Sequence, residues 1–417
     1  MNILITEGHT DANIGSGALV ENSLVLLRDR YPGANLRVVS IYPEAFRKTF
    51  DVDSVFDPFE YPYKKPWLQK LAWIFKTVFW MAVIRLQAAS GMASVRFYKS
   101  KLDNYLWADM VVSVHAERIK EAFYIDALYT LFSFRIAHLI GKKVVLFPCT
   151  LGPYGFGTRW LVNRWLRNVD LLFTRDELSF KLANETKGLS SDRIVRSADV
   201  AVMQRMVGRT ESLALIGCSS QDQLVGISVM HWRYIKGNRS PYSNYAAYVA
   251  EMAKVVDRLI TGYGVKVVLY PTNYAIRGCT TEDREACREI YQSSAHKDRV
   301  ICVEKFMSPA ELKGALACSE VNITTRMHAC IFSTGAGVPT LAVNYLYKLR
   351  EYMANLGLED FSIDIEEFNA DWMLSAFDRM WQRRAEIRLQ IQTRMEANRS
   401  LLQTSMRHLE MLDFSTN

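Results

Sequence analysis

The sequence lacks several features that would indicate whole classes of protein. Its 7 cysteines are scattered and include no Cys-x-x-Cys pair, which argues against a disulfide framework and against a zinc site. No basic region or signal-peptide core precedes the first apolar segment, Asn2–Thr6, which is typical of a β-strand. The loop over residues 7–17 contains a Gly-x-Gly but not the complete dinucleotide fingerprint. We therefore expect a cytoplasmic protein without a metal or a bound cofactor.

Acidic residues are missing from one long segment. Residues 61–101 contain no Asp or Glu, although the formal net charge of the whole chain is only +7. The basic residues of this segment are Lys64, Lys65, Lys70, Lys76, Arg85, Arg96, Lys99 and Lys101. Nucleic-acid binding is not favoured, because this basic tract is confined to one aromatic region and no recognition motif accompanies it.

The aromatic stretch over residues 66–85 lies inside this basic segment. Lys70, Lys76 and Arg85 interrupt it, so no uncharged run approaches the ~20 residues that span a bilayer. Trp and Phe beside Lys and Arg are typical of a helix that lies on an anionic membrane surface. A buried amphipathic helix with snorkelling lysines explains the pattern equally well. The first alternative predicts peripheral membrane contact through residues 61–101.

The 417 residues are enough for two domains, since single cores stop growing at roughly 250 to 300 residues. Short runs rich in Val, Ile and Leu alternate with helical patterns, which predicts an α/β fold with parallel sheets. The strands expected are 3–6, 36–41, 110–114, 143–147 and 171–174 in the first half, and 224–229, 265–270, 300–303, 321–324 and 340–343 in the second. We predict doubly wound domains over residues 1–210 and 211–385, and a C-terminal helix over 386–417 that packs back on them.

Three candidate ligand residues follow two neighbouring strands of the second domain. Arg326 and His328 come where the strand 321–324 ends and a helix begins, and Lys348 follows the strand 340–343. Adjacent parallel strands end at one edge of a sheet, so we expect the three side chains to converge. With the helix N-terminus they predict an anion site for phosphate or carboxylate. No Asp or Glu occurs between Glu320 and Glu351, so we expect no carboxylate to neutralise these cations.

The alternative for this segment is a surface Arg, a core His and a solvated Lys. Several motifs together favour the ligand site: Arg326-x-His328, the turn Gly335-Ala-Gly-Val-Pro339 and Tyr345-x-x-Lys348. In this combination the chain resembles the polysaccharide pyruvyl transferases. Further landmarks of that family are Asn13-Ile-Gly15, Leu151-Gly-Pro153, Thr174-Arg-Asp-Glu-Leu-Ser179 and Ser197-Ala-Asp199. One departure is Ser16, where the family usually has an acidic residue.

The resemblance implies two Rossmann-like domains in a glycosyltransferase-B arrangement. It also implies that phosphoenolpyruvate, as co-substrate, gives its enolpyruvyl unit to a sugar, with closure of a ketal and loss of phosphate. Arg326 and Lys348 would bind the donor anion, and Arg175, after the strand 171–174, would be a further donor ligand. Without the resemblance, Arg175 is an ordinary arginine beside the helix cap Asp176. His328 would be the general acid that protonates C3 of the donor.

The acceptor would be a saccharide, either free or lipid-linked. Its candidate ligands are the polar residues of the first loop, Glu7, His9, Asp11 and Asn13, together with His115, which follows the strand 110–114. These side chains can bind sugar hydroxyls or deprotonate one of them. His115 is equally well explained as a structural hydrogen-bonding residue.

Two other functions fit the same fold. Many sugar-nucleotide glycosyltransferases have a Glu seven residues before the proline of the Gly-x-Pro turn, where this chain has Phe332. This difference favours phosphoenolpyruvate over a sugar nucleotide as donor. A non-catalytic assembly protein would explain Ser16, but the presence of Arg326, His328 and Lys348 together argues against it.

Overall fold

The computed structural model describes all residues except 57–65, 90–98, 232–244, 280 and 415–417. The chain divides into two compact units, the first made of residues 1–9, 23–199 and 401–417, and the second of residues 10–22 and 200–400. The main division thus falls after Asp199 and not after residue 210 as expected. Residues 200–210 belong to the second unit because they bond within it, as Val207 N does to Ala310 O at 3.3 Å.

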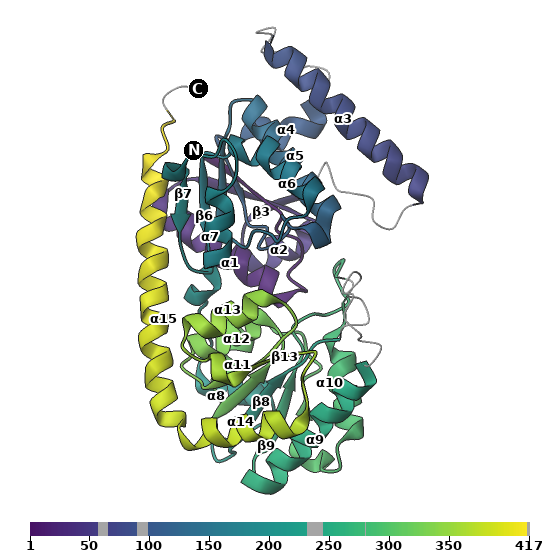
Figure 1. The fold of residues 1–417 in the computed structure, drawn as a ribbon, viewed down its shortest axis with the longest axis vertical. Helices are drawn as coiled ribbons and strands as arrows, with labels where there is room; N and C mark the ends of the chain where they lie inside the picture. The colour runs from purple at the N-terminus through teal and green to yellow at the C-terminus, as the bar shows by residue number, and fades with distance from the viewer. Residues whose placement is uncertain (57–65, 90–98, 232–244, 280, 415–417) are drawn as a thin grey trace. The chain divides into compact units, whose positions relative to one another are not determined.

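The first unit contains a seven-stranded parallel sheet with the order β3-β2-β1-β4-β5-β6-β7. Figure 1 labels β3, β6 and β7 of this sheet. Its strands are β1 (Asn2–Thr6), β2 (Asn35–Ser40), β3 (Asp53–Phe56), β4 (Met110–Ser113), β5 (Lys143–Cys149), β6 (Leu171–Thr174) and β7 (Ile194–Arg196). The helices that follow them are α1 (Ile14–Arg30), α2 (Pro43–Phe50), α3 (Trp67–Ala89), α4 (Lys99–Trp107), α5 (Tyr124–Leu139), α6 (Phe156–Trp165) and α7 (Glu177–Asn184).

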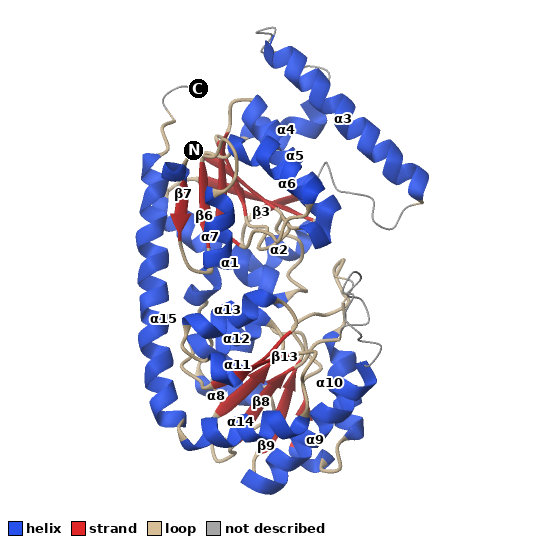
Figure 2. Cartoon of the chain, viewed as in Figure 1, coloured by secondary structure: helices blue, strands red, loops and turns tan. Residues whose placement is uncertain are grey.

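The second unit repeats this topology in a six-stranded parallel sheet with the order β10-β9-β8-β11-β12-β13. Its strands are β8 (Leu224–Ser228), β9 (Lys266–Tyr270), β10 (Val300–Cys302), β11 (Val321–Thr324), β12 (Thr340–Asn344) and β13 (Ser362–Asp364). Its helices are α8 (Arg209–Leu215), α9 (Tyr245–Tyr263), α10 (Asp283–Ser293), α11 (Pro309–Leu316), α12 (Met327–Gly335), α13 (Tyr347–Asn355) and α14 (Ala370–Gln382). Helices flank the strands of each sheet (Figure 2), which confirms the predicted α/β class.

Both strand orders are those of the Rossmann fold, in which the chain winds outward from a central pair of strands in both directions. These pairs are β1 with β4 and β8 with β11. Their strands are fully or nearly fully buried because helices cover both faces, as their runs of Val, Ile and Leu predict. The carboxyl ends of each central pair are the places where such sheets bind ligands.

The last long helix, α15 (Arg384–Met406), has residues in both units. In the second unit, Arg399 Nη2 donates to the carbonyl of Gly335 at 2.8 Å. In the first unit, the Ser405 hydroxyl lies 2.7 Å from that of Ser197, and Leu409 beyond the helix accepts from Tyr31. The C-terminal segment therefore packs back on the chain as predicted, although its helices begin at Ala370 and break at Arg383. None of the described helices has the length and apolar composition needed to cross a bilayer.

Candidate functional site

Arg326 lies at the carboxyl end of β11, beside the central strand β8 of the second sheet. It is the N-cap residue of α12, so the predicted arrangement of strand, turn and helix is confirmed. The Asp283 carboxylate binds it in a bidentate pair, with 2.6 Å from Nη2 to Oδ1 and 3.1 Å from Nε to Oδ2. Burial alone would lower the Arg326 pKa, but Asp283 and the Tyr345 phenol outweigh burial and raise it. Arg326 is therefore a fixed cation.

The expectation that no carboxylate neutralises this corner is wrong for Arg326. Asp283 is fully buried at the first position of α10, and it also accepts from the backbone N–H groups of His231, Thr272 and Asn273 at 3.0 to 3.4 Å. It was missed because it lies 43 residues before Arg326 in the chain. Its position after β9 placed it at the same sheet edge, and this was the signal that could have found it.

His328 packs against the glycine of the first-loop motif. A Cβ atom built on Gly15 would lie 2.2 Å from Nδ1 and 2.7 Å from Cγ of the half-buried His328 ring. Only a residue without a side chain leaves room for the imidazole in this position. Two motifs that are more than 300 residues apart in the sequence, Asn13-Ile-Gly15 and Arg326-x-His328, therefore meet within the second unit.

The first loop belongs to the second unit because it pairs with the segment that follows β9. Asn13 forms an antiparallel bridge with Asn273, and Tyr274 N donates to Ala12 O at 3.0 Å. Asn13 also caps α1, because its Oδ1 accepts from Ser16 N at 3.1 Å. The expected acceptor ligand Asn13 thus has a structural role that the sequence alone did not reveal.

Asp11 forms an ion pair with Arg277, which sequence reasoning also missed. Burial raises the pKa of Asp11, and the Arg277 cation partly offsets this effect. Oδ1 of Asp11 is buried without a hydrogen-bond partner among the described residues. Asp11 therefore has one oxygen engaged by Arg277 and one oxygen left for a ligand or a solvent molecule.

Lys348 lies in the first turn of α13, after β12, and is 7% exposed. Since β12 pairs with β11, Lys348 and Arg326 follow adjacent strands as predicted. Tyr345, in the loop before Lys348, lies near enough to Arg326 to help raise its pKa. The N-termini of α12 and α13 both lack a side-chain cap among the described residues. Their backbone N–H groups and partial positive charges suit an anion at this edge.

Glu7 and His115 lie at the corresponding edge of the first sheet, after β1 and β4. The Glu7 carboxylate accepts from the hydroxyls of Ser113 and Thr130. Its φ of 67° is a left-handed conformation, which is uncommon outside glycine and often occurs at functional sites. The central strand pair therefore presents a buried carboxylate beside a histidine.

His115 is buried and kept neutral. Burial lowers its pKa to about 4, and Arg118 and Arg175 act in the same direction against the carboxylate of Glu7. Arg118 N donates to its Nδ1 at 3.4 Å, whereas Nε2 has no partner among the described residues. His9 is similar, since burial and Arg118 lower its pKa to about 3. Both imidazoles are thus neutral at neutral pH.

Arg175 follows β6 with its side chain almost fully buried in the first unit. Nη1 forms a 2.5 Å ion pair with Asp199, and Nε donates to the Thr150 hydroxyl at 3.0 Å. Burial opposes its charge, but Asp199, Glu117 and Asp176 raise its pKa. The Arg175 pair joins two of the family landmarks, and Nη2 alone has no partner among the described residues.

The basic aromatic stretch forms α3. Trp73 packs against the core of the first unit, with its ring centroid 6.4 Å from that of Tyr129. The opposite face exposes large apolar side chains at helical spacing, namely Trp67, Leu68, Leu71, Phe75, Val78 and Phe79. The alternative of a fully buried amphipathic helix is therefore wrong for the described side chains. Of the basic residues expected here, Lys64, Lys65 and Arg96 lie outside the described residues.

Comparison with solved structures supports the fold. A UDP-N-acetylglucosamine 2-epimerase from Neisseria meningitidis, bound to UDP-GlcNAc, has a TM-score of 0.59 at 11% identity and covers 99% of both chains. MnaA from S. aureus, in a co-structure with UDP, also has a TM-score of 0.59, at 14% identity, covering 98% of this chain and 94% of that one. These likenesses establish the glycosyltransferase-B-like fold alone.

Sequence comparison is more specific. The chain is 22% identical over 422 residues to the amylovoran biosynthesis protein AmsJ of Erwinia amylovora, covering 96% of this chain and 97% of that protein. The profile of the polysaccharide pyruvyl transferases matches residues 13–347, a span that begins at the Asn13-Ile-Gly15 loop and includes Arg326 and His328. The protein is therefore a transferase and belongs to the polysaccharide pyruvyl transferase family.

Proposed function

We propose that the protein transfers the enolpyruvyl unit of phosphoenolpyruvate to a saccharide and closes a pyruvate ketal on it. The observation that carries this proposal is the contact between Gly15 and the His328 ring, which unites two family motifs that are more than 300 residues apart in the sequence. Membership of the family and the likeness to a protein of amylovoran biosynthesis support a saccharide of a polysaccharide pathway as acceptor.

The donor anion is proposed to bind at the carboxyl edge of β11 and β12. Because Asp283 occupies Nε and Nη2 of Arg326, the Nη1 amino group is the edge that faces a ligand. The Arg326–Asp283 pair is close to neutral as a unit. Lys348 and the uncapped N-termini of α12 and α13 therefore supply much of the attraction for phosphate and carboxylate groups.

His328 is proposed as the general acid. A hydroxyl of the acceptor attacks C2 of phosphoenolpyruvate and releases its proton to solvent, while C3 takes a proton from the imidazolium of His328. A second hydroxyl then displaces phosphate from C2, returns its proton to the His328 imidazole and completes the ketal. Contact with Gly15 fixes the ring, and a positioned acid of this kind contributes roughly 10²- to 10⁴-fold to the rate.

Glu7 and His115 are proposed to bind the acceptor at the edge of the first sheet, where His9 of the first unit adds a polar side chain. Asp11, in the second unit, is a further candidate acceptor ligand. The neutral His115 accepts from Arg118 N through Nδ1, so its Nε2 carries the ring proton and can donate a hydrogen bond to an acceptor hydroxyl. His115→Gln should therefore raise the KM for the acceptor and lower kcat, while donor binding is retained. Normal acceptor kinetics in this variant would remove His115 from the reaction.

The donor assignment is tested by incubating the protein with phosphoenolpyruvate or with sugar nucleotides in the presence of acceptor. Phosphate release from phosphoenolpyruvate is expected. Release of a nucleotide would favour the glycosyltransferase alternative, which the fully buried Phe332 of α12 does not support. If neither co-substrate were consumed, the protein would be a non-catalytic member of the family.

The role of His328 is tested by His328→Gln, with His296→Gln in the same unit as the matched control. The first variant should bind phosphoenolpyruvate normally, as measured by calorimetry, but turn over about 10²- to 10⁴-fold more slowly. The control should behave as wild type, because His296 lies before β10, away from the edge that carries Arg326. Near-normal turnover of His328→Gln would exclude His328 as the acid.

We also propose peripheral membrane contact through α3, because its exposed face combines Trp, Leu and Phe with Lys76 in a segment without acidic residues. Replacing Lys64, Lys65, Lys70 and Lys76 by Gln should weaken binding to anionic liposomes by about 1 kcal/mol per lysine near the surface. Unchanged binding would exclude this contact.

A further inference from the structure

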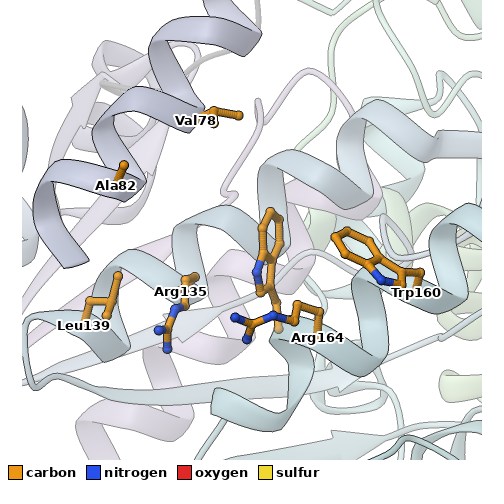
Figure 3. Close-up of a pocket in the computed structure, with 7 residues that line it drawn as sticks. Val78, Ala82, Arg135, Leu139, Trp160 and Arg164 are labelled. Atoms are coloured by element: carbon orange, nitrogen blue, oxygen red, sulfur yellow. The ribbon is translucent and has the colours of Figure 1, made fainter. Parts of the chain in front are cut away.

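A cavity of about 260 Å³ lies between α3, α5 and α6 of the first unit, away from the strand edges described above. Figure 3 shows Val78 and Ala82 on α3 facing Leu139 and Arg135 on α5, with Trp160 and Arg164 on α6. Trp165 completes the lining. The cavity thus combines apolar walls with two guanidinium groups, and none of the described residues that line it has a carboxylate.

The two arginines differ in how firmly they are held. Arg135 Nη1 donates to the Asn168 side chain at 3.0 Å, which fixes its orientation. Arg164 is half-buried and has no hydrogen-bond or ion-pair partner among the described residues. Arginine forks suit phosphate oxygens, and a cation at a half-dry site gains more from such a ligand than a fully solvated one.

The surroundings of the cavity are also cationic. After burial, which is the main cause, the arginines 135, 193 and 167 lower the pKa of His138, and only Asp170 opposes them. The nearest part of α3 comes from the segment without Asp or Glu. A polyanionic headgroup would therefore meet a positive field on more than one side.

The apolar walls continue onto an exposed surface. On α3, Val78 lies on the same face as Phe75 and Phe79, and Phe75 is 72% exposed. On α6, Trp160 is 60% exposed and Phe156 is 95% exposed. A headgroup held in the cavity can thus have a long hydrocarbon chain that lies along these side chains and into a membrane.

We propose that this cavity binds the phosphate of an isoprenoid phosphate lipid, with Arg135 and Arg164 on the phosphate and the apolar walls on the first isoprene units. This inference rests on the proposed function, since it identifies the acceptor as a saccharide carried on such a lipid. Two features support this occupant over a free sugar. The cavity volume suits a headgroup and a few carbons, and the cavity combines arginine charges with apolar walls that can bind hydrocarbon.

The test measures binding of farnesyl phosphate, and of vesicles of phosphatidylcholine with a few per cent undecaprenyl phosphate, without any phosphoenolpyruvate. Arg164→Gln should weaken both by about tenfold or more, the loss expected for a charge-assisted hydrogen bond. The matched control is Arg159→Gln on the same helix, whose side chain is 49% exposed and pairs with Glu185 at 3.9 Å. It should bind as wild type.

Four results would overturn the proposal. The first three are equal binding by wild type and Arg164→Gln, equal losses in both variants, and complete competition by inorganic phosphate. The fourth is equal binding of vesicles in which phosphatidylglycerol replaces the isoprenoid phosphate. The last would indicate a general anionic surface, and complete competition by millimolar inorganic phosphate would indicate a free-phosphate site instead. Since the assay contains no donor, failure of pyruvyl transfer and failure of lipid binding are measured separately.

Discussion

One methyl group added at Gly15 should move the His328 ring while the fold is retained. The new Cβ would lie 2.2 Å from Nδ1, whereas ordinary contact begins at 3.4 Å. The imidazole must therefore retreat by about 1 Å, and a displacement of this size can lower turnover about 100-fold. Gly15 lies in the first turn of α1, where alanine is a better helix former than glycine, so the backbone itself should tolerate the change.

Gly17→Ala is the matched control for this prediction. Gly17 lies two residues further along α1, and a Cβ there would be 3.5 Å from Cα of Asp11 and 3.7 Å from Cγ of Pro309, which is ordinary contact. The control should keep its activity and gain up to about 1 kcal/mol in free energy of unfolding. Both variants thus make the same chemical change in the same helix, and only one of them reaches His328.

The assay is steady-state release of phosphate from phosphoenolpyruvate with the acceptor saccharide, together with thermal unfolding of each variant. The expected result is a large fall in kcat for Gly15→Ala alone, with a small change in Tm. Wild-type turnover in Gly15→Ala would refute the argument that the glycine positions the imidazole. Equal losses in both variants would place the cause in the loop itself and not in the ring.

Three further outcomes follow from buried charges. Asp283→Asn leaves Arg326 without its carboxylate and should lower the free energy of unfolding in urea by about 3 kcal/mol; an unchanged midpoint would contradict the buried pair. The His115 pKa is about 4 in the folded chain, whereas an ordinary histidine has a pKa of 6.5. Up to about 3 kcal/mol of the free energy of unfolding should therefore be lost as pH falls from 6.5 to 4, and His115→Gln should reduce that loss. Burial lowers the Lys313 pKa to about 8, so the free energy of unfolding of the wild type should rise between pH 8 and 10.5 relative to that of Lys313→Met. If the two proteins showed the same dependence of unfolding free energy on pH, this prediction would be refuted.

The sequence predicted the central strands of both sheets because they are continuous apolar runs buried on both faces. It missed β3, β7 and β13, which lie at or beside the sheet edges and have only three or four residues, some of them exposed. A strand at the edge of a sheet pairs with only one neighbour and is only partly covered by helices, so its run of apolar residues is short. Their pairing is visible only once the neighbouring strand is in place.

The candidate site was predicted where its residues follow a strand locally, as Arg326, His328 and Lys348 do. Its partners were not predicted, because Asp283 and Gly15 reach these residues through tertiary packing over long sequence separations. The segment between residues 320 and 351 indeed contains no Asp or Glu, but in the folded chain a carboxylate from another segment, Asp283, lies beside it. An absence of charge along a segment therefore says little about the charge balance of the folded site.

The composition of the first unit has a consequence for its synthesis. Residues 401–417 belong to this unit, yet they are translated after the whole of residues 200–400. During translation, the hydrogen bonds of Ser197 with Ser405 and of Tyr31 with Leu409 cannot form until the C-terminal segment has been synthesised. The first sheet can form early, but its final packing is delayed by some tens of seconds at usual elongation rates. During this interval, chaperones have access to a surface that the finished protein covers.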